Sequence, residues 1–153
     1  MEPEGYPWYG IVQGTELAQG DLLEGCPIFL PPADLADPWE EAAFAWQQRD
    51  VIVLTQSCDL VAGREKVTEV LLCAAWSRSE LTSGHLSTPR GLEDARRGNL
   101  PGYHPLAECH RPGLARELRI VDFRSVDSLP LTFVRQVAAR GGERLLSRRS
   151  RFV

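Results

Sequence analysis

The densest group of side chains that could do chemistry follows one short apolar run in this chain. The residues Val51 to Leu54 lead through Thr55 into Gln56, Ser57, Cys58 and Asp59. Cys58 offers a thiol, which becomes a good nucleophile when a nearby cation lowers its pKa. The adjacent Asp59 has the opposite effect on that pKa. We predict binding residues at Gln56, Ser57 and Cys58 and a candidate catalytic group at Asp59, although these residue types alone do not specify a reaction.

Residues from later in the chain could complete this site in different ways. His104 could serve as a base for Cys58, or Asp59, His104 and Arg124 could act together as acid–base and phosphate-contacting groups. Tyr103, next to His104, is included among the predicted binding residues. Asp59 and Arg124 could instead join Gln56 in a hydrogen-bonded cluster, because buried polar groups need partners. Cys58 could then be a small buried packing residue, which is common for free cysteine.

A zinc site is a further alternative. Cys26, Cys58 and His104 could coordinate zinc from separate strands. The spacing gives this hypothesis little support, since the cysteines at 26, 58, 73 and 109 form no Cys-x-x-Cys pair. The chain also lacks a phosphate-binding loop, a dinucleotide fingerprint, a Gly-x-Ser-x-Gly elbow and a His-Glu-x-x-His motif. Whether the protein is an enzyme therefore stays open.

The element that must position the site is the apolar run itself. A short continuous run rich in β-branched residues predicts a strand buried on both faces, and the apolar segment 67–76 predicts its hairpin partner. Asp37, Pro38 and Glu40 resemble the start of a helix that would continue to Arg49. The other expected elements are strands over 8–13, 20–30 and 118–124, a short helix over 92–97 and a closing helix over 130–140.

These elements predict an α+β fold. We expect a small, partly open SH3-like β-barrel or a curled antiparallel sheet with two or three helices. Pro27 predicts an edge strand or a bulge for the second strand. The 153 residues are expected to form a single domain, with residues 140–153 as a basic C-terminal tail.

The charge distribution is asymmetric. Residues 1–60 carry 11 acidic side chains and one basic side chain, Arg49, whereas residues 61–153 carry 10 acidic and 16 basic ones. The two halves could neutralise each other within the fold or across a partner, and the arginine-rich C-terminal tail could contact nucleic acid. The N-terminus has no signal-peptide pattern and no apolar run is long enough to span a membrane. We therefore expect a bacterial cytoplasm, with all four cysteines reduced.

Four motifs resemble a family of small uncharacterised bacterial proteins. They are Gly20-Asp21-Leu22-Leu23 with Cys26-Pro27, Thr55-Gln56-Ser57-Cys58-Asp59-Leu60, Leu100-Pro101-Gly102-Tyr103-His104, and Val121-Asp122-Phe123-Arg124 followed by Ser128-Leu129-Pro130-Leu131. The resemblance implies a shared shape and shared positions, but no mechanism. A weaker, fold-level resemblance to PemK/MazF-like ribonuclease toxins rests on the order of a Gly-Asp turn, a long insertion and an apolar strand with a polar end.

Three functional hypotheses follow. The first is a protein-binding or regulatory module, suggested by the charge asymmetry and by the aromatic N-terminus with Tyr6, Trp8 and Tyr9, since interfaces are enriched in Tyr, Trp and Arg. The second is a toxin-like endoribonuclease that uses Asp59, His104 and Arg124. The third is a zinc-binding protein that uses Cys26, Cys58 and His104.

Overall fold

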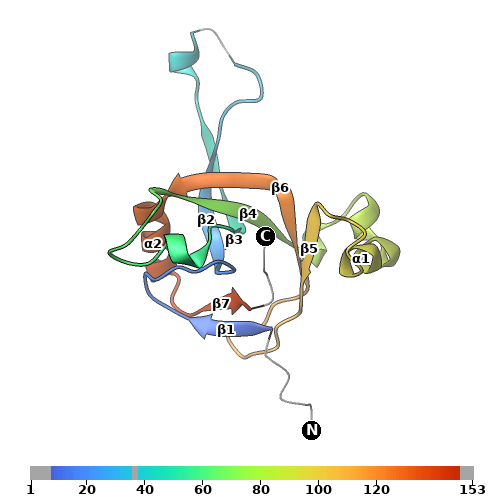
Figure 1. Ribbon diagram of the computed structural model, residues 1–153. Coiled ribbons are helices and arrows are strands. Elements are labelled where there is room, and N and C mark those ends of the chain that lie inside the picture. The colour runs from blue at the N-terminus through green and yellow to red at the C-terminus, as the bar shows by residue number, and fades with distance from the viewer. Residues whose placement is uncertain (1–7, 36–37, 149–153) are drawn as a thin grey trace.

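The computed structural model describes residues 8–35 and 38–148. Figure 1 shows a mixed arrangement of strands and helices, which confirms the α+β class. Five strands form an antiparallel sheet in the order β2-β3-β4-β6-β5, and β1 pairs with β7 in a separate two-stranded sheet. The five-stranded sheet is not closed into a barrel. The strands are β1 (Tyr9–Val12), β2 (Leu22–Leu30), β3 (Ala45–Val53), β4 (Glu69–Ser77), β5 (Tyr103–Leu106), β6 (Arg119–Pro130) and β7 (Arg144–Ser147), and the α-helices are α1 (Pro89–Arg96) and α2 (Leu131–Arg140).

The predicted central strand is confirmed at the end of β3. Val51, Ile52 and Val53 are fully buried and pair with β4. Val51 and Val53 pack in one core cluster with residues of α2, whereas Ile52 packs in a second cluster with residues of β1 and β7. Each buried aliphatic side chain contributes about 1.5–3 kcal/mol. This strand therefore links the two halves of the core.

The predicted helix ending at Arg49 is wrong. Asp37 lies outside the described residues. Among the described residues from 38 on, a three-residue 3-10 turn forms at Trp39–Glu41, and residues 45–53 are one continuous strand paired with β2. Residues 26–30 and 45–49 pair with each other and project from the body as a two-stranded arm (Figure 1). Trp46 lies opposite Phe29 in this ribbon and is exposed. Cross-strand pairing has overridden the local capping signals.

The predictions for the second strand and for the closing helix are confirmed. β2 is an edge strand with a register shift between Leu23 and Cys26, as Pro27 predicted. The closing helix is confirmed as α2, with Leu131, Val134 and Ala138 on its buried face. Within the described residues, no helix is long and apolar enough to cross a bilayer.

The segment between β4 and β5 forms regular structure of its own. It contains two 3-10 turns, Arg78–Glu80 and His85–Ser87, followed by α1, and we call residues 78–100 the lobe. Leu92 and Ala95 of α1 pack with Ile120 of β6 in a small core of their own. Gly91 allows the close approach inside the lobe, because a Cβ atom there would lie 1.8 Å from the carbonyl oxygen of His85. The lobe is thus fixed against the end of the sheet.

Candidate ligand-binding cleft

The polar end of the central strand forms a structural corner. The backbone N–H of Gln19 donates to Ser57 Oγ at 2.9 Å, and the side-chain amide of Gln19 donates to the carbonyl oxygen of Leu54 at 2.7 Å. Thr55 Oγ1 accepts from the backbone N–H of Leu71 at 2.9 Å. The hydroxyl groups of Ser57 and Thr55 therefore bind the backbone at Gln19 and Leu71 and hold these segments together.

Cys58 is exposed on the 3-10 turn Ser57–Asp59, so its interpretation as a buried packing residue is wrong. Its Sγ lies 3.8 Å from Gln56 Oε1 and 3.7 Å from Asp59 Oδ1. Asp59 also lies 3.9 Å from Lys66 Nζ. The thiol therefore faces a carboxylate and an amide oxygen. The adjacent hollow, of about 410 Å³, has two carboxylates in its lining, Asp59 and Glu69, but no arginine or histidine.

The predicted catalytic group Asp59, His104 and Arg124 is divided between two places. His104 lies on β5 and Arg124 on β6, whereas Asp59 lies on the turn after β3. Burial lowers the pKa of His104, which favours the neutral imidazole. Arg124 contacts Asp122, so the proposed Gln56–Asp59–Arg124 cluster is replaced by a different pair.

The predicted zinc ligands are also separated. Cys26 is buried in β2, Cys58 is exposed, and His104 lies on β5 at the opposite edge of the sheet. Three strands, β3, β4 and β6, separate β2 from β5. Over residues 8–35 and 38–148, no group of three His, Cys, Asp or Glu side chains is placed to hold a metal ion. Burial raises the pKa of Cys26 to about 11, with Asp127 adding to the effect, so this residue is a neutral thiol.

The structure does bring two predicted site residues together. The guanidinium carbon of Arg124 lies 4.7 Å from the centre of the Tyr103 ring, a cation–π contact. Arg124 Nε also lies 3.5 Å from Asp122 Oδ1. Tyr103 comes from β5, and both Asp122 and Arg124 come from β6, which pairs with it. Adjacent strands therefore build this corner.

The contacts continue across the sheet from Asp122. Asp122 Oδ2 accepts a long hydrogen bond from Trp76 Nε1, at 3.4 Å. The guanidinium of Arg49 lies over the Trp76 ring at 5.2 Å, and Arg49 also pairs with Asp127 at 3.3 Å. We call this series the ladder, and its members in order are Asp127, Arg49, Trp76, Asp122, Arg124 and Tyr103.

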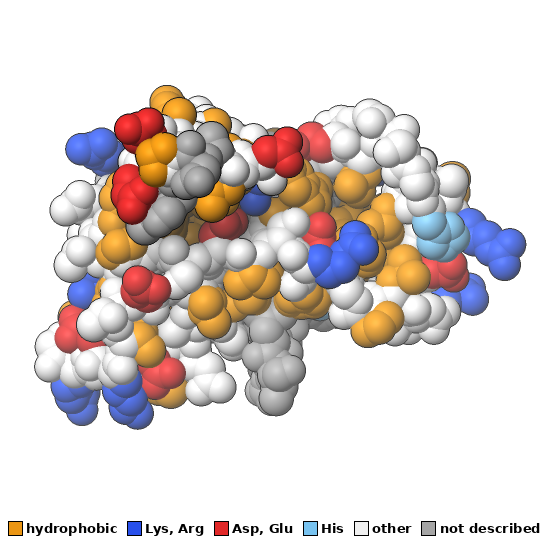
Figure 2. Space-filling model, turned by 90° about the horizontal axis from the view of Figure 1, so that it is seen from above, with side chains coloured by type: hydrophobic (Ala, Val, Ile, Leu, Met, Phe, Trp, Pro, Cys, Tyr) orange, Lys and Arg blue, Asp and Glu red, His pale blue; other side chains and the backbone are white. Residues whose placement is uncertain are grey.

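One end of the ladder borders a cleft of about 510 Å³. Trp76, Asp122, Arg124 and Tyr103 form its floor on the sheet side, and the opposite wall comes from the lobe. Seen from above, hydrophobic side chains gather in the hollow between the centre of the molecule and the lobe, with acidic and basic side chains among them (Figure 2). The lobe residues of the wall include Glu80, Leu81, His85, Leu86 and Leu100.

Sequence reasoning singled out Tyr103 and Arg124 but missed Trp76 and Asp122 as parts of the same site. Asp122 carried a usable signal, because an acidic residue within an apolar strand needs a donor. Its backbone position two residues before Arg124 also allows Arg124 N–H to donate to Asp122 Oδ1, at 2.9 Å. Trp76 gave no comparable signal, since its partners come from strands far away in the sequence.

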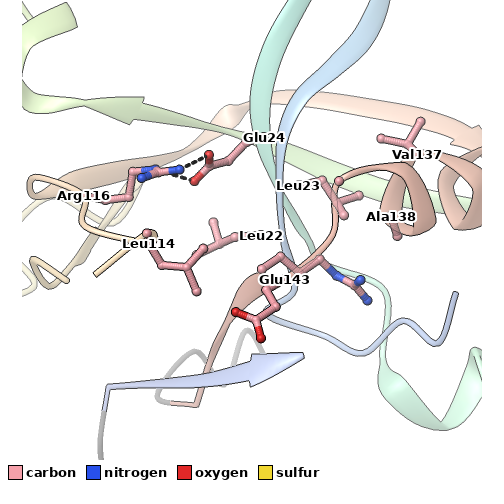
Figure 3. A pocket seen from close by; sticks show the side chains of 11 residues that line it. Leu22, Leu23, Glu24, Leu114, Arg116, Val137, Ala138 and Glu143 are labelled. Atoms are coloured by element: carbon pink, nitrogen blue, oxygen red, sulfur yellow. Dashed lines mark hydrogen bonds and ion pairs between the residues drawn. The ribbon is translucent and has the colours of Figure 1, made fainter. Parts of the chain in front are cut away.

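A separate cavity, of about 190 Å³, is lined in part by Leu22, Leu23 and Glu24 of β2 (Figure 3). Charged residues in its lining form pairs that stabilise the fold. Glu24 accepts two hydrogen bonds of 2.6 Å from Arg116 at its rim. The buried pair Asp21–Arg144 lies at 2.5 and 3.1 Å, and Arg144 also donates to the carbonyl oxygen of Gly14 at 2.8 Å. These pairs join the acidic first half of the chain to the basic second half. Arg144 is thus part of the fold, and the predicted tail does not begin before Arg148; Arg149 and Arg151 lie outside the described residues.

The comparisons with known proteins give no further guidance. No protein-family model, curated protein or solved structure matches this chain.

Proposed function

We propose that this protein is a binding module that engages a protein partner through its projecting arm. The observation that carries the proposal is the exposure of Phe29 and Trp46, which lie opposite each other on the ribbon and are 55% and 62% exposed. Phe44, beside Trp46, is also exposed. Large aromatic side chains grouped on one projecting element are typical anchors of protein interfaces.

The backbone of the arm supports the same proposal. β3 pairs with β4 over Val51–Val53, so the segment 45–50 has β2 on one side, and no strand of the described part of the chain pairs with its other side. A two-stranded ribbon is marginally stable alone, and an open strand edge can pair with another chain. A partner that covers the arm would satisfy the backbone groups and bury the aromatic rings.

The charge of the arm defines the partner that it fits. Asp34, Glu40 and Glu41 are exposed near its tip, while Arg49 at its base is engaged by Asp127. The arm is therefore acidic and apolar. We propose a partner protein whose surface combines basic residues with an apolar patch, because complementary charge speeds and orients association.

Site-specific photo-crosslinking would test the proposal. A photoreactive phenylalanine analogue placed at Phe29 should capture one stoichiometric partner in the native host, and the same analogue at Val126 should not. Val126 is a matched control, because it is an exposed apolar residue that belongs to β6 and not to either strand of the arm. The captured protein should then bind the purified chain, and Phe29→Ser with Trp46→Ser should weaken that binding at least tenfold. Capture of a second copy of this chain, or equal capture from both positions, would contradict the proposal.

We infer that the two sheets of this protein together form a partly open barrel. An isolated bridge joins Asp21 to Leu146, and Ser147 N–H donates to the carbonyl oxygen of Gly20 at 2.9 Å, so β7 adjoins the start of β2. At the other end, Tyr9 Oη donates to the carbonyl oxygen of Ala107, just after β5, at 2.5 Å. The β1–β7 pair thus approaches both edges of the curved sheet. The ribonuclease alternative gains no comparable support, since its predicted residues are dispersed.

A further inference from the structure

We propose that the cleft between the sheet and the lobe binds a small organic anion, in which a carboxylate or phosphate group is attached to an apolar body. This site is separate from the aromatic tip of the arm, and the inference does not depend on the protein-binding proposal. Its anchor is Arg124 and its walls are the apolar side chains of the lobe.

The balance of donors and acceptors favours an anion. Asp122 is the carboxylate beside Arg124, but it already accepts from Arg124 N–H at 2.9 Å, from Trp76 Nε1 at 3.4 Å and from Ser125 Oγ at 3.3 Å. Glu80, the other carboxylate of the lining, accepts from the backbone N–H of Ser77 at 3.1 Å. Asp122 is thus buried and engaged within the protein, and the exposed Glu80 uses one oxygen, Oε1, in such a bond.

Arg124, by contrast, presents donors outward. Its side chain is 70% exposed, and it contacts Asp122 through Nε. The Tyr103 ring supports the guanidinium from one side at 4.7 Å. A planar guanidinium held in this way is suited to a bidentate contact with carboxylate or phosphate, because less conformational freedom is lost on binding.

The remaining surface of the cleft defines the body of the ligand. Leu81, Leu86 and Leu100 line it together with the Trp76 and Tyr103 rings. Its volume of about 510 Å³ lies within the range of about 300–1,000 Å³ that is usual for small-molecule sites. An anion attached to one aromatic ring would leave room to spare and would place its ring against apolar walls.

The test uses four probes that separate charge from apolar contact. They are phenyl phosphate, 3-phenylpropionate, the neutral 3-phenylpropanol and inorganic phosphate. Titrations followed by NMR would read the indole N–H of Trp76, which reports on the cleft through its bond to Asp122. We expect both aromatic anions to bind with a dissociation constant of about a millimolar, as is usual for ligands of this size. The neutral alcohol and inorganic phosphate should each bind at least tenfold more weakly.

Three variants assign the binding to Arg124. Arg124→Gln should weaken binding of phenyl phosphate at least tenfold, Arg124→Lys should weaken it less, and Arg64→Gln should leave it unchanged. Arg64 is an exposed arginine in the loop between β3 and β4. The inference is overturned if the Trp76 signal does not respond to either aromatic anion, or if Arg124→Gln binds as the original protein does. Equal binding of the neutral alcohol would also overturn it. A stronger response to phenyl phosphate than to 3-phenylpropionate would identify the phosphate as the preferred anionic group.

Discussion

The two ends of the β2–β3 hairpin lie in opposite environments. At the base, Leu22 and Ile52 lie opposite each other and are buried in the core. At the tip, Phe29 and Trp46 lie opposite each other with more than half of each side chain exposed. The same pair of strands therefore contributes folding energy at one end and an accessible apolar surface at the other. This division allows the tip to change with little effect on the stability of the fold.

The largest expected effect comes from the ion pair next to the base. Arg144→Ala would leave the buried Asp21 carboxylate without its charged partner, at a cost of about 3–5 kcal/mol in the free energy of unfolding. Urea denaturation would measure the loss. The exposed neighbour Arg140→Ala is the control and should change stability by less than about 0.5 kcal/mol. Equal losses for the two variants would show that the Asp21–Arg144 ion pair does not stabilise the base of the hairpin.

Paired truncations would test the comparison directly. Ile52→Ala should cost about 2–5 kcal/mol, because it opens a cavity between strands. Trp46→Ala removes a larger side chain but should cost less than about 1 kcal/mol, since most of that side chain is already in water. Both values come from the same denaturation experiment. A loss for Trp46→Ala as large as that for Ile52→Ala would mean that the tip is part of the folding core.

A smaller effect is expected at the bulge between base and tip, where Glu24 meets Arg116. The hydrogen bonds from Arg116 hold the pKa of Glu24 below its ordinary value of 4.5. A lowered folded-state pKa means that the stabilisation is present above pH 4.5 and is lost as the pH falls through the folded pKa. Glu24→Gln should cost about 1 kcal/mol at pH 7 and should lose less further stability on acidification than the original protein.

Unfolding by urea at pH 7 and at several values below pH 4.5 would measure this difference. Glu143→Gln, an exposed carboxylate near the same cavity, is the matched control. Parallel pH profiles for the original protein and Glu24→Gln would contradict the assigned role of the pair.

The last prediction concerns hydrogen exchange along β3 in the original protein, without any substitution. In native-state hydrogen exchange, amides of Val51–Val53 that donate within the sheet should exchange at least about a hundredfold more slowly than those of residues 45–48, because the tip can open without exposing the core. Uniform protection along β3 would mean that the hairpin opens as one unit. Protection that rises only at 45–48 when a partner is added would support the proposed docking through the arm.

Much of the fold was predictable because it depends on local patterns. The β-branched run Val51–Val53 predicted a strand buried on both faces, and the apolar spacing of residues 131–138 predicted α2. Pro27 predicted the edge position of β2. The 38–49 segment misled because its capping residues favour a helix locally, whereas the pairing of Trp46 with Phe29 depends on a strand that lies elsewhere in the sequence.

The residues of the candidate site could also be predicted only in part. The sequence by itself indicated Tyr103 as a binding residue and Arg124, which lies beside the apolar Phe123, as a group that needs a partner. Only the tertiary structure decided that they meet each other rather than Asp59, because the antiparallel pairing of β5 with β6 brings Tyr103 opposite Asp122. The same holds for Asp21 and Arg144, whose pairing joins residues 123 positions apart. Residue types fix which groups need partners, but strand order and register choose the partners, and these depend on contacts that no local pattern records.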